Sequence, residues 1–169
     1  GATIAATDIY NNEGVVVVTP SATSPALTEG KNFHFIFRTI GRDDQQGPSA
    51  AKFIIEKAKP SKVAAPHAKQ SYGQGIASSV RDELTNAGVN VAMFEGINAG
   101  DSDYSAVITK LKGAGVDFVY YGGYHPEMGL LLRQASEQGL KVRMMGPEGV
   151  GNPEVNAIAG NAVEGMLVT

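Results

Sequence analysis

The chain has 169 residues, 43% of them hydrophobic, and 14 Lys and Arg against 17 Asp and Glu give a formal net charge of -3. This composition supports a packed core, and the lack of a basic block argues against a nucleic-acid partner. The chain has no cysteine, which excludes a disulfide framework and a thiolate zinc site, and its longest apolar runs are far shorter than the roughly 20 residues of a membrane-spanning helix.

Short β-branched or aromatic runs alternate with stretches of helical periodicity, which is typical of repeated strand and helix units around a parallel sheet. A first helix is expected at residues 3–10. Strands are then expected at residues 15–19, 33–39, 62–66, 90–94, 117–121, 142–145 and 165–168, and helices at residues 46–58, 74–87, 102–113, 126–138 and 153–158. The sequence therefore predicts an α/β fold, a parallel sheet with helices on both faces.

A polar segment that contains a proline, residues 57–62, is the best site for a crossing between two lobes. We therefore expect residues 1–60 to belong to a first lobe and residues 61–169 to form a second, ligand-binding lobe. The alternative is that both parts pack as one continuous domain. Pro66 removes a hydrogen-bond donor from a strand that should be central, so this strand either ends early or lies at an edge of the sheet.

Ligands of open parallel sheets bind beyond the carboxyl ends of the strands, so the loops that follow the predicted strands are the places to look for a site. These loops are residues 19–25, 67–73, 122–125 and 146–149. Each precedes a helix, whose first N–H groups suit an anion, and they contribute the rings of Tyr72 and Tyr124 and the carboxylate of Glu148. A zwitterion would match this set, with its carboxylate on hydroxyls and helix N-termini, its ammonium on Glu148 and its side chain against the tyrosines.

Each of these residues also has a purely structural interpretation. Ser24-Pro25 is typical of an N-cap followed by a first helical proline, in which case Thr23 is incidental. Taken singly, Tyr72 and Tyr124 match half-buried aromatic residues with wet hydroxyls, and Glu148 matches a solvated loop acid. Their parallel placement at one edge of the sheet favours a functional site.

Other chemistry finds little support in the sequence. The three histidines, His34, His67 and His125, lack metal-ligand spacing, and the glycine-rich residues 146–151 lack dinucleotide-binding spacing. No nucleophile motif is present, so we expect no catalytic residue, no metal and no cofactor. An α/β enzyme acting on an amino acid or amide, with Glu148 as base, and a ligand-sensing module remain as alternatives.

Several segments resemble the branched-chain amino-acid-binding proteins of bacterial ABC importers, also called leucine/isoleucine/valine-binding proteins. The resemblance lies in residues 6–10, 19–23, 46–48, 69–73, 120–129 and 145–151, and the last two are its most specific part. It implies the periplasmic binding protein type I fold with flavodoxin-like lobes. It further implies a two-lobed periplasmic receptor that closes on a free aliphatic amino acid, leucine, isoleucine or valine, and docks on an ABC permease.

The resemblance also implies the ligand-binding residues, which are Ser21, Ala22, Thr23, Tyr72, Tyr124 and Glu148. In that family the first three positions grip the α-amino and α-carboxylate groups, the glutamate pairs with the ammonium, and the tyrosines frame the site. The sequence departs from the family pattern at Ala65, Pro66 and Ala68, where two bulkier apolar residues and an aspartate are expected.

Family members extend beyond this sequence at both ends. We therefore expect a truncated central piece that lacks a signal peptide and carries most of the second lobe. Such a piece should bind leucine weakly or undetectably, because one wall of the site is absent. Its first 60 residues should expose apolar faces, which predicts either self-association or repacking into one continuous sheet.

Overall fold

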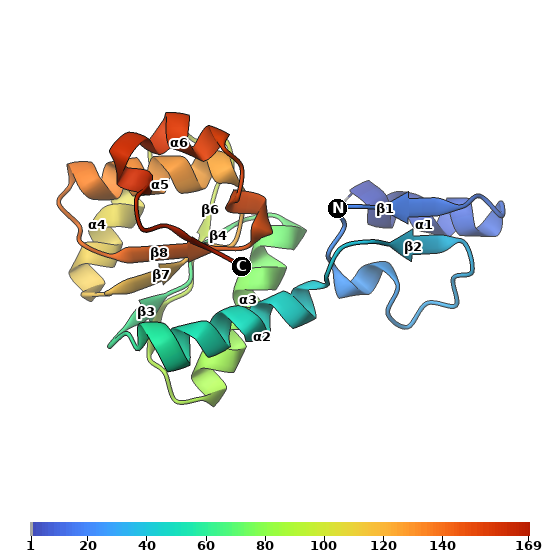
Figure 1. The fold of residues 1–169 in the computed structure, drawn as a ribbon, viewed down its shortest axis with the longest axis horizontal. Coiled ribbons are helices and arrows are strands. Elements are labelled where there is room, and N and C mark those ends of the chain that lie inside the picture. The colour runs from blue at the N-terminus through green and yellow to red at the C-terminus, as the bar shows by residue number, and fades with distance from the viewer. Residues whose placement is uncertain (1) are drawn as a thin grey trace.

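The computed structural model describes residues 2–169, so the predicted first lobe is described from residue 2. The chain divides into a small and a large unit, connected at residues 39–42 (Figure 1). The small unit consists of helix α1 (Ala2–Asn12), strand β1 (Val17–Thr19), the 3-10 helix η1 (Pro25–Leu27) and strand β2 (Ile36–Arg38). No helix within residues 2–169 combines the length and the apolar character needed to cross a membrane.

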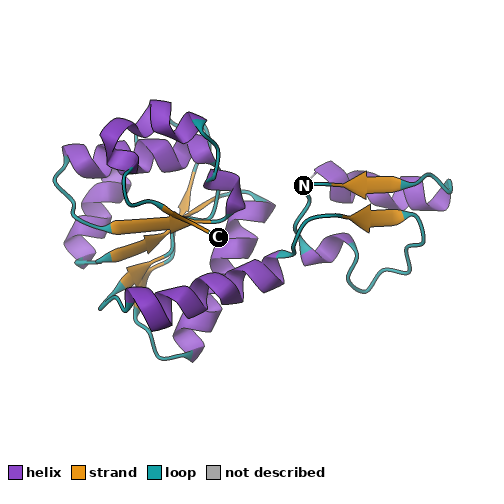
Figure 2. Ribbon diagram, viewed as in Figure 1, coloured by secondary structure: helices purple, strands orange, loops and turns teal. Residues whose placement is uncertain are grey.

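The large unit is built on a five-stranded sheet whose neighbouring strands all pair in parallel (Figure 2). In spatial order the strands are β5 (Val91–Met93), β3 (Val63–Ala64), β7 (Phe118–Tyr120), β8 (Arg143–Gly146) and β9 (Leu167–Val168). The helices are α2 (Asp43–Phe53), which continues as the π-helix η2 (Ile54–Ala58), α3 (Ser71–Asn86), α4 (Ser105–Ala114), α5 (His125–Glu137), the 3-10 helix η3 (Glu148–Val150), α6 (Glu154–Ala159) and the 3-10 helix η4 (Gly160–Val163).

Helices cover both faces of this sheet, as the sequence predicted. Phe118 and Tyr120 of β7 share a core cluster with apolar residues of α2 and α3, whereas Val119 and the following Tyr121 share a second cluster with α4, α5 and α6. Successive side chains of a strand point to opposite faces, so β7 is buried on both sides. This confirms the predicted α/β architecture.

The division between the units lies near residue 40 and not at residue 60. Helix α2 packs against α3, and Ala50 and Ala51 of α2 belong to the same core cluster as Ile54 of η2 and Val63 of β3. The polar segment at residues 57–62 is therefore a turn inside the large unit. The two strands of the small unit form their own sheet and do not extend the five-stranded one.

The strand that contains Pro66 ends early and is not an edge. It stays between β5 and β7 as β3, stops at Ala64, and is followed by a separate strand β4 (His67–Ala68), which pairs with β6 (Gly96–Ile97). The carbonyl of Pro66 accepts a hydrogen bond from the Gly122 N–H, but proline has no N–H to return. The sequence did not predict β4 and β6 as separate strands, and nothing in the structure explains the alanines at positions 65 and 68, which are both fully buried.

The sheet of the small unit leaves one face bare. Ile36 of β2 is buried. The side chains that point to the other face of the sheet are between 36% and 60% exposed, namely Val16, Val18, Phe35 and Phe37. Val18 and Phe37 are register partners, so these apolar side chains form one surface, which we call the β1–β2 face.

Candidate functional site

The residues predicted from the sequence meet where the two units adjoin. Five of the six line one cavity of about 50 Å3, namely Ser21, Ala22, Thr23, Tyr72 and Tyr124. Glu148 joins them because its Oε1 accepts a hydrogen bond of 2.6 Å from the Tyr72 hydroxyl. The loops after β1, β4, β7 and β8 are thus brought together, as expected for the carboxyl ends of parallel strands.

Two tyrosines and Glu148 form the wall that the large unit contributes. The rings of Tyr72 and Tyr124 lie 5.0 Å apart between centroids at an interplanar angle of 33°. The Tyr72 hydroxyl donates to Glu148 and accepts a bond of 3.3 Å from the Gly149 N–H. Burial, together with the hydrogen bond to Glu148, raises the pKa of the Tyr72 phenol well above its usual value, so this hydroxyl stays a donor at physiological pH.

The loop of the small unit is held from both sides. The Thr19 hydroxyl accepts the N–H groups of Ser21 and Ala22, at 3.4 and 3.0 Å. Arg38, at the end of β2, donates through Nη1 to the carbonyl oxygens of Ala22 and Ser24, at 3.1 and 2.9 Å. These bonds fix a loop that would otherwise be one of the more mobile parts of a small unit.

The structure adds Asp43, which the sequence did not single out. Asp43 is the first residue of α2, is only 6% exposed, and donates its N–H to the Thr23 carbonyl at 3.0 Å. Burial raises the pKa of its carboxyl; the side chain of Thr23 opposes this rise, and the charge of Glu148 adds to it. An acid in the first turn of a helix is common, so nothing in the sequence separates Asp43 from its neighbour Asp44.

The charge of Glu148 raises the pKa of Asp43 and that of Arg38 lowers it, so the two carboxylates lie within electrostatic range of each other. Within residues 2–169, Asp43 Oδ1 and Glu148 Oε2 are both buried and lack a hydrogen-bond partner. A buried, unpaired carboxylate oxygen carries a large desolvation penalty, which a bound cation would relieve. The described residues contain no group of three or more His, Asp or Glu that could hold a metal ion.

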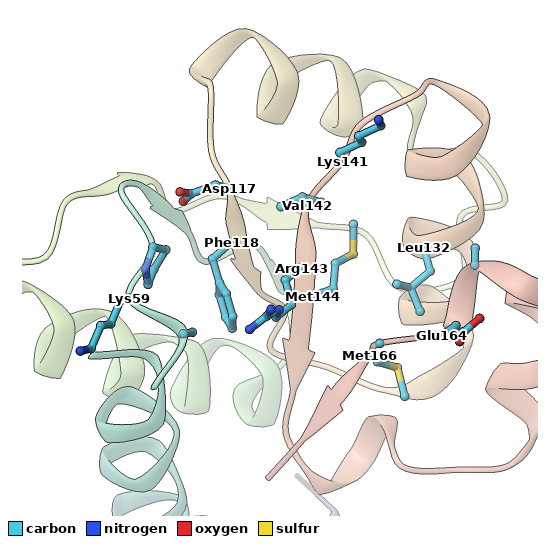
Figure 3. A pocket seen from close by; sticks show the side chains of 14 residues that line it. Lys59, Asp117, Phe118, Leu132, Lys141, Val142, Arg143, Met144, Glu164 and Met166 are labelled. Atoms are coloured by element: carbon cyan, nitrogen blue, oxygen red, sulfur yellow. The ribbon is translucent and has the colours of Figure 1, made fainter. Parts of the chain in front are cut away.

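A larger cavity lies elsewhere and contains none of these residues. It has a volume of about 480 Å3 and is found at the amino ends of β7 and β8, where Lys59, Asp117, Phe118, Arg143 and Met166 contribute to its lining (Figure 3). Parallel sheets bind ligands at the opposite end of their strands. We therefore place the site in the smaller cavity, which has the unpaired carboxylates beside it.

The chain matches known proteins over nearly all its length. The model of the family described as Periplasmic binding protein matches residues 1–169. The "Leucine-, isoleucine-, valine-, threonine-, and alanine-binding protein" of Pseudomonas aeruginosa is 61% identical over 164 residues, and the "Leu/Ile/Val-binding protein" of Escherichia coli (strain K12) is 52% identical over 164 residues. Each alignment covers 97% of this chain and 44% of the relative, so the chain spans less than half the length of these proteins.

Solved structures agree with these sequence relatives. A leucine binding protein from Thermotoga maritima superposes with a TM-score of 0.91 at 30% identity, over 98% of this chain and 47% of that one. A branched-chain amino acid transporter substrate binding protein from Streptococcus pneumoniae, in complex with isoleucine, superposes with a TM-score of 0.84 at 31% identity, over 94% of this chain and 44% of that one. These matches confirm the resemblance that the sequence motifs indicated.

Proposed function

The chain belongs to the periplasmic binding protein family, and from this we propose that it is part of a solute receptor for branched-chain aliphatic amino acids. Its ligand is leucine, isoleucine or valine, and the intact receptor works in the periplasm and passes the ligand to the permease of an ABC transporter. The names of its relatives support this ligand class. The small unit contributes to a first lobe, and residues 43–169 contribute to a second.

The pair of unpaired carboxylate oxygens carries this proposal. An α-ammonium group between Asp43 and Glu148 relieves both, at about 1.5–3 kcal/mol for each charge-assisted hydrogen bond. The α-carboxylate binds the loop that contains Ser21, Ala22 and Thr23, and the aliphatic side chain packs against the tyrosine rings. Binding requires no bond to be made or broken.

An enzymatic role has weaker support. Glu148 is the only residue that the alternative uses as a base, and its Oε1 is already engaged by the Tyr72 hydroxyl. The side chains around it are tyrosines, a threonine and a second carboxylate, which bind and orient a ligand but supply no activated nucleophile. We therefore propose a receptor without catalytic activity.

A chemical-shift titration of the isotope-labelled chain tests the ligand class. We expect leucine to cause saturable shifts of the backbone amides of Thr23, Tyr72 and Glu148. The control ligand is 4-methylpentanoate, which has the same side chain and carboxylate but no ammonium. It should bind at least about tenfold more weakly, because it leaves both carboxylates unpaired. Equal affinities for the two ligands, or no shift with leucine, would refute the proposal.

We also propose that the chain self-associates through the β1–β2 face. A two-stranded parallel sheet with a bare apolar face is not stable on its own in water, and parallel sheets are normally covered on both sides. Two copies of the face would cover each other about a twofold axis.

A further inference from the structure

Gln46 reaches from α2 to the backbone of Glu148, although the two are 102 residues apart in the sequence. The Glu148 N–H donates to Gln46 Oε1 at 3.0 Å, and the Thr169 hydroxyl donates to the same oxygen at 2.7 Å. A backbone N–H is always a donor, so the amide oxygen of Gln46, and not its nitrogen, must face Glu148.

Glu148 needs this acceptor because of its place in the fold. It opens the short helix η3, and the first N–H groups of a helix have no partner inside the helix. Its carboxylate is bound by Tyr72, and the next N–H, of Gly149, also donates to Tyr72. Gln46 supplies the remaining anchor, so the backbone and the carboxylate of Glu148 are held by different residues.

The backbone of Gln46 is itself set rigidly. The next residue, Gly47, faces α3 so closely that a Cβ on it would lie 2.2 Å from Ser79 Oγ and 2.7 Å from Ser79 Cβ. Helix α2 is therefore seated directly on α3 at Gly47, the residue after Gln46, and the reach of the Gln46 side chain limits where the backbone of Glu148 can lie.

We propose that Gln46 is a positioning residue for recognition of the ligand ammonium. By fixing the backbone of Glu148, it holds in place the carboxylate whose Oε2 is unpaired, and it ties this position to Thr169, the residue after β9. The role in ammonium recognition rests on the proposed function. The anchoring of Glu148 by Gln46 does not, because these hydrogen bonds form without a ligand. Loss of Gln46 should thus weaken binding of ammonium-bearing ligands and leave binding of the carboxylate and side chain intact.

Two substitutions separate positioning from general structural support. Gln46→Leu removes the acceptor oxygen but keeps a side chain of similar size. Gln46→Glu keeps an acceptor oxygen at the same distance along the side chain. Ser49→Ala is the matched control on α2, since the Ser49 hydroxyl bonds only to the Gln45 carbonyl on the exposed side of the helix.

The first measurement is hydrogen exchange of the Glu148 amide without ligand. Gln46→Leu should accelerate it about tenfold through the loss of one hydrogen bond, while Gln46→Glu and Ser49→Ala should leave it near the wild-type rate. The second measurement is the titration with leucine and 4-methylpentanoate. Gln46→Leu should lower the leucine affinity about tenfold and leave that for 4-methylpentanoate unchanged, and Gln46→Glu should retain leucine binding.

An unchanged exchange rate in Gln46→Leu, or an equal loss of affinity for both ligands, would overturn the inference. A wild-type chain that binds neither ligand would refute the proposed function. In that case the exchange rates alone would still decide whether Gln46 holds Glu148 in place.

Discussion

Replacing Gly47 by alanine tests the close seating of α2 on α3, on which the positions of Asp43 and Gln46 depend. The new Cβ would lie 2.2 Å from Ser79 Oγ and 2.7 Å from Ser79 Cβ. The hydroxyl can rotate away, but the Cβ of Ser79 is fixed to the backbone of α3, so the two helices must separate. Overpacking of this kind costs about 1–3 kcal/mol, and the better helix propensity of alanine returns up to about 1 kcal/mol. We expect a net loss of about 1–2 kcal/mol in the free energy of unfolding.

Urea denaturation measures this loss, and two further variants control for it. Gly75→Ala makes the same change on α3 at a position where nothing lies within 4 Å of the new Cβ, and it should stabilise the chain by about 0.5–1 kcal/mol. Ser79→Gly removes both contacting atoms and should recover most of the stability of Gly47→Ala when the two are combined. If Gly47→Ala is as stable as Gly75→Ala, the close approach of α2 and α3 is not a real constraint.

Further predictions address the site and the small unit. Asp43→Asn should raise the free energy of unfolding at pH 7, because the folded state raises the pKa of Asp43 and so disfavours its charged form. Urea titrations should show that this gain in stability fades as the pH falls toward the ordinary aspartate pKa of about 3.9. A variant that is less stable than the wild type at pH 7 would contradict this. Arg38 holds the Ala22 and Ser24 carbonyls through Nη1 and the Thr28 hydroxyl through Nη2, and a lysine has one nitrogen in place of these two. Arg38→Lys should therefore lower the leucine affinity measured by titration about fivefold or more, and an unchanged affinity would contradict this. Phe37→Glu should abolish concentration-dependent association in sedimentation velocity, and a variant that still associates like the wild type would exclude the β1–β2 face.

The main strands and helices were predictable because their periodicity reflects burial. Residues 118–121 form a continuous apolar run, and β7 is buried on both faces. The two-residue strands β4 and β6 have no such run, and nothing local predicts their pairing. The boundary near residue 60 was wrong because a polar turn with a proline is needed wherever a helix returns to a strand, and the true connection at residues 39–42 is no more polar.

The site was predictable where it follows strands. Thr23, Tyr72 and Glu148 follow the carboxyl ends of β1, β4 and β8, so each could be found by looking just beyond the end of a predicted strand. Asp43 and Gln46 stand in the first turns of a helix, and their roles depend on partners far away in the sequence. Their contribution became visible only with the unpaired oxygens and the long-range hydrogen bonds of the folded chain.

The interruption at Pro66 bears on how the tyrosine rim can move. It leaves the pairing of β4 with β6 outside the hydrogen-bonded ladder of the five-stranded sheet. His67 and Ala68 are nevertheless buried, and the Ala68 N–H donates to the Gly122 carbonyl at 2.9 Å, so the segment that leads into Tyr72 stays bonded to the loop that carries Tyr124. Tyr72 and Tyr124 should therefore change position together and not one at a time.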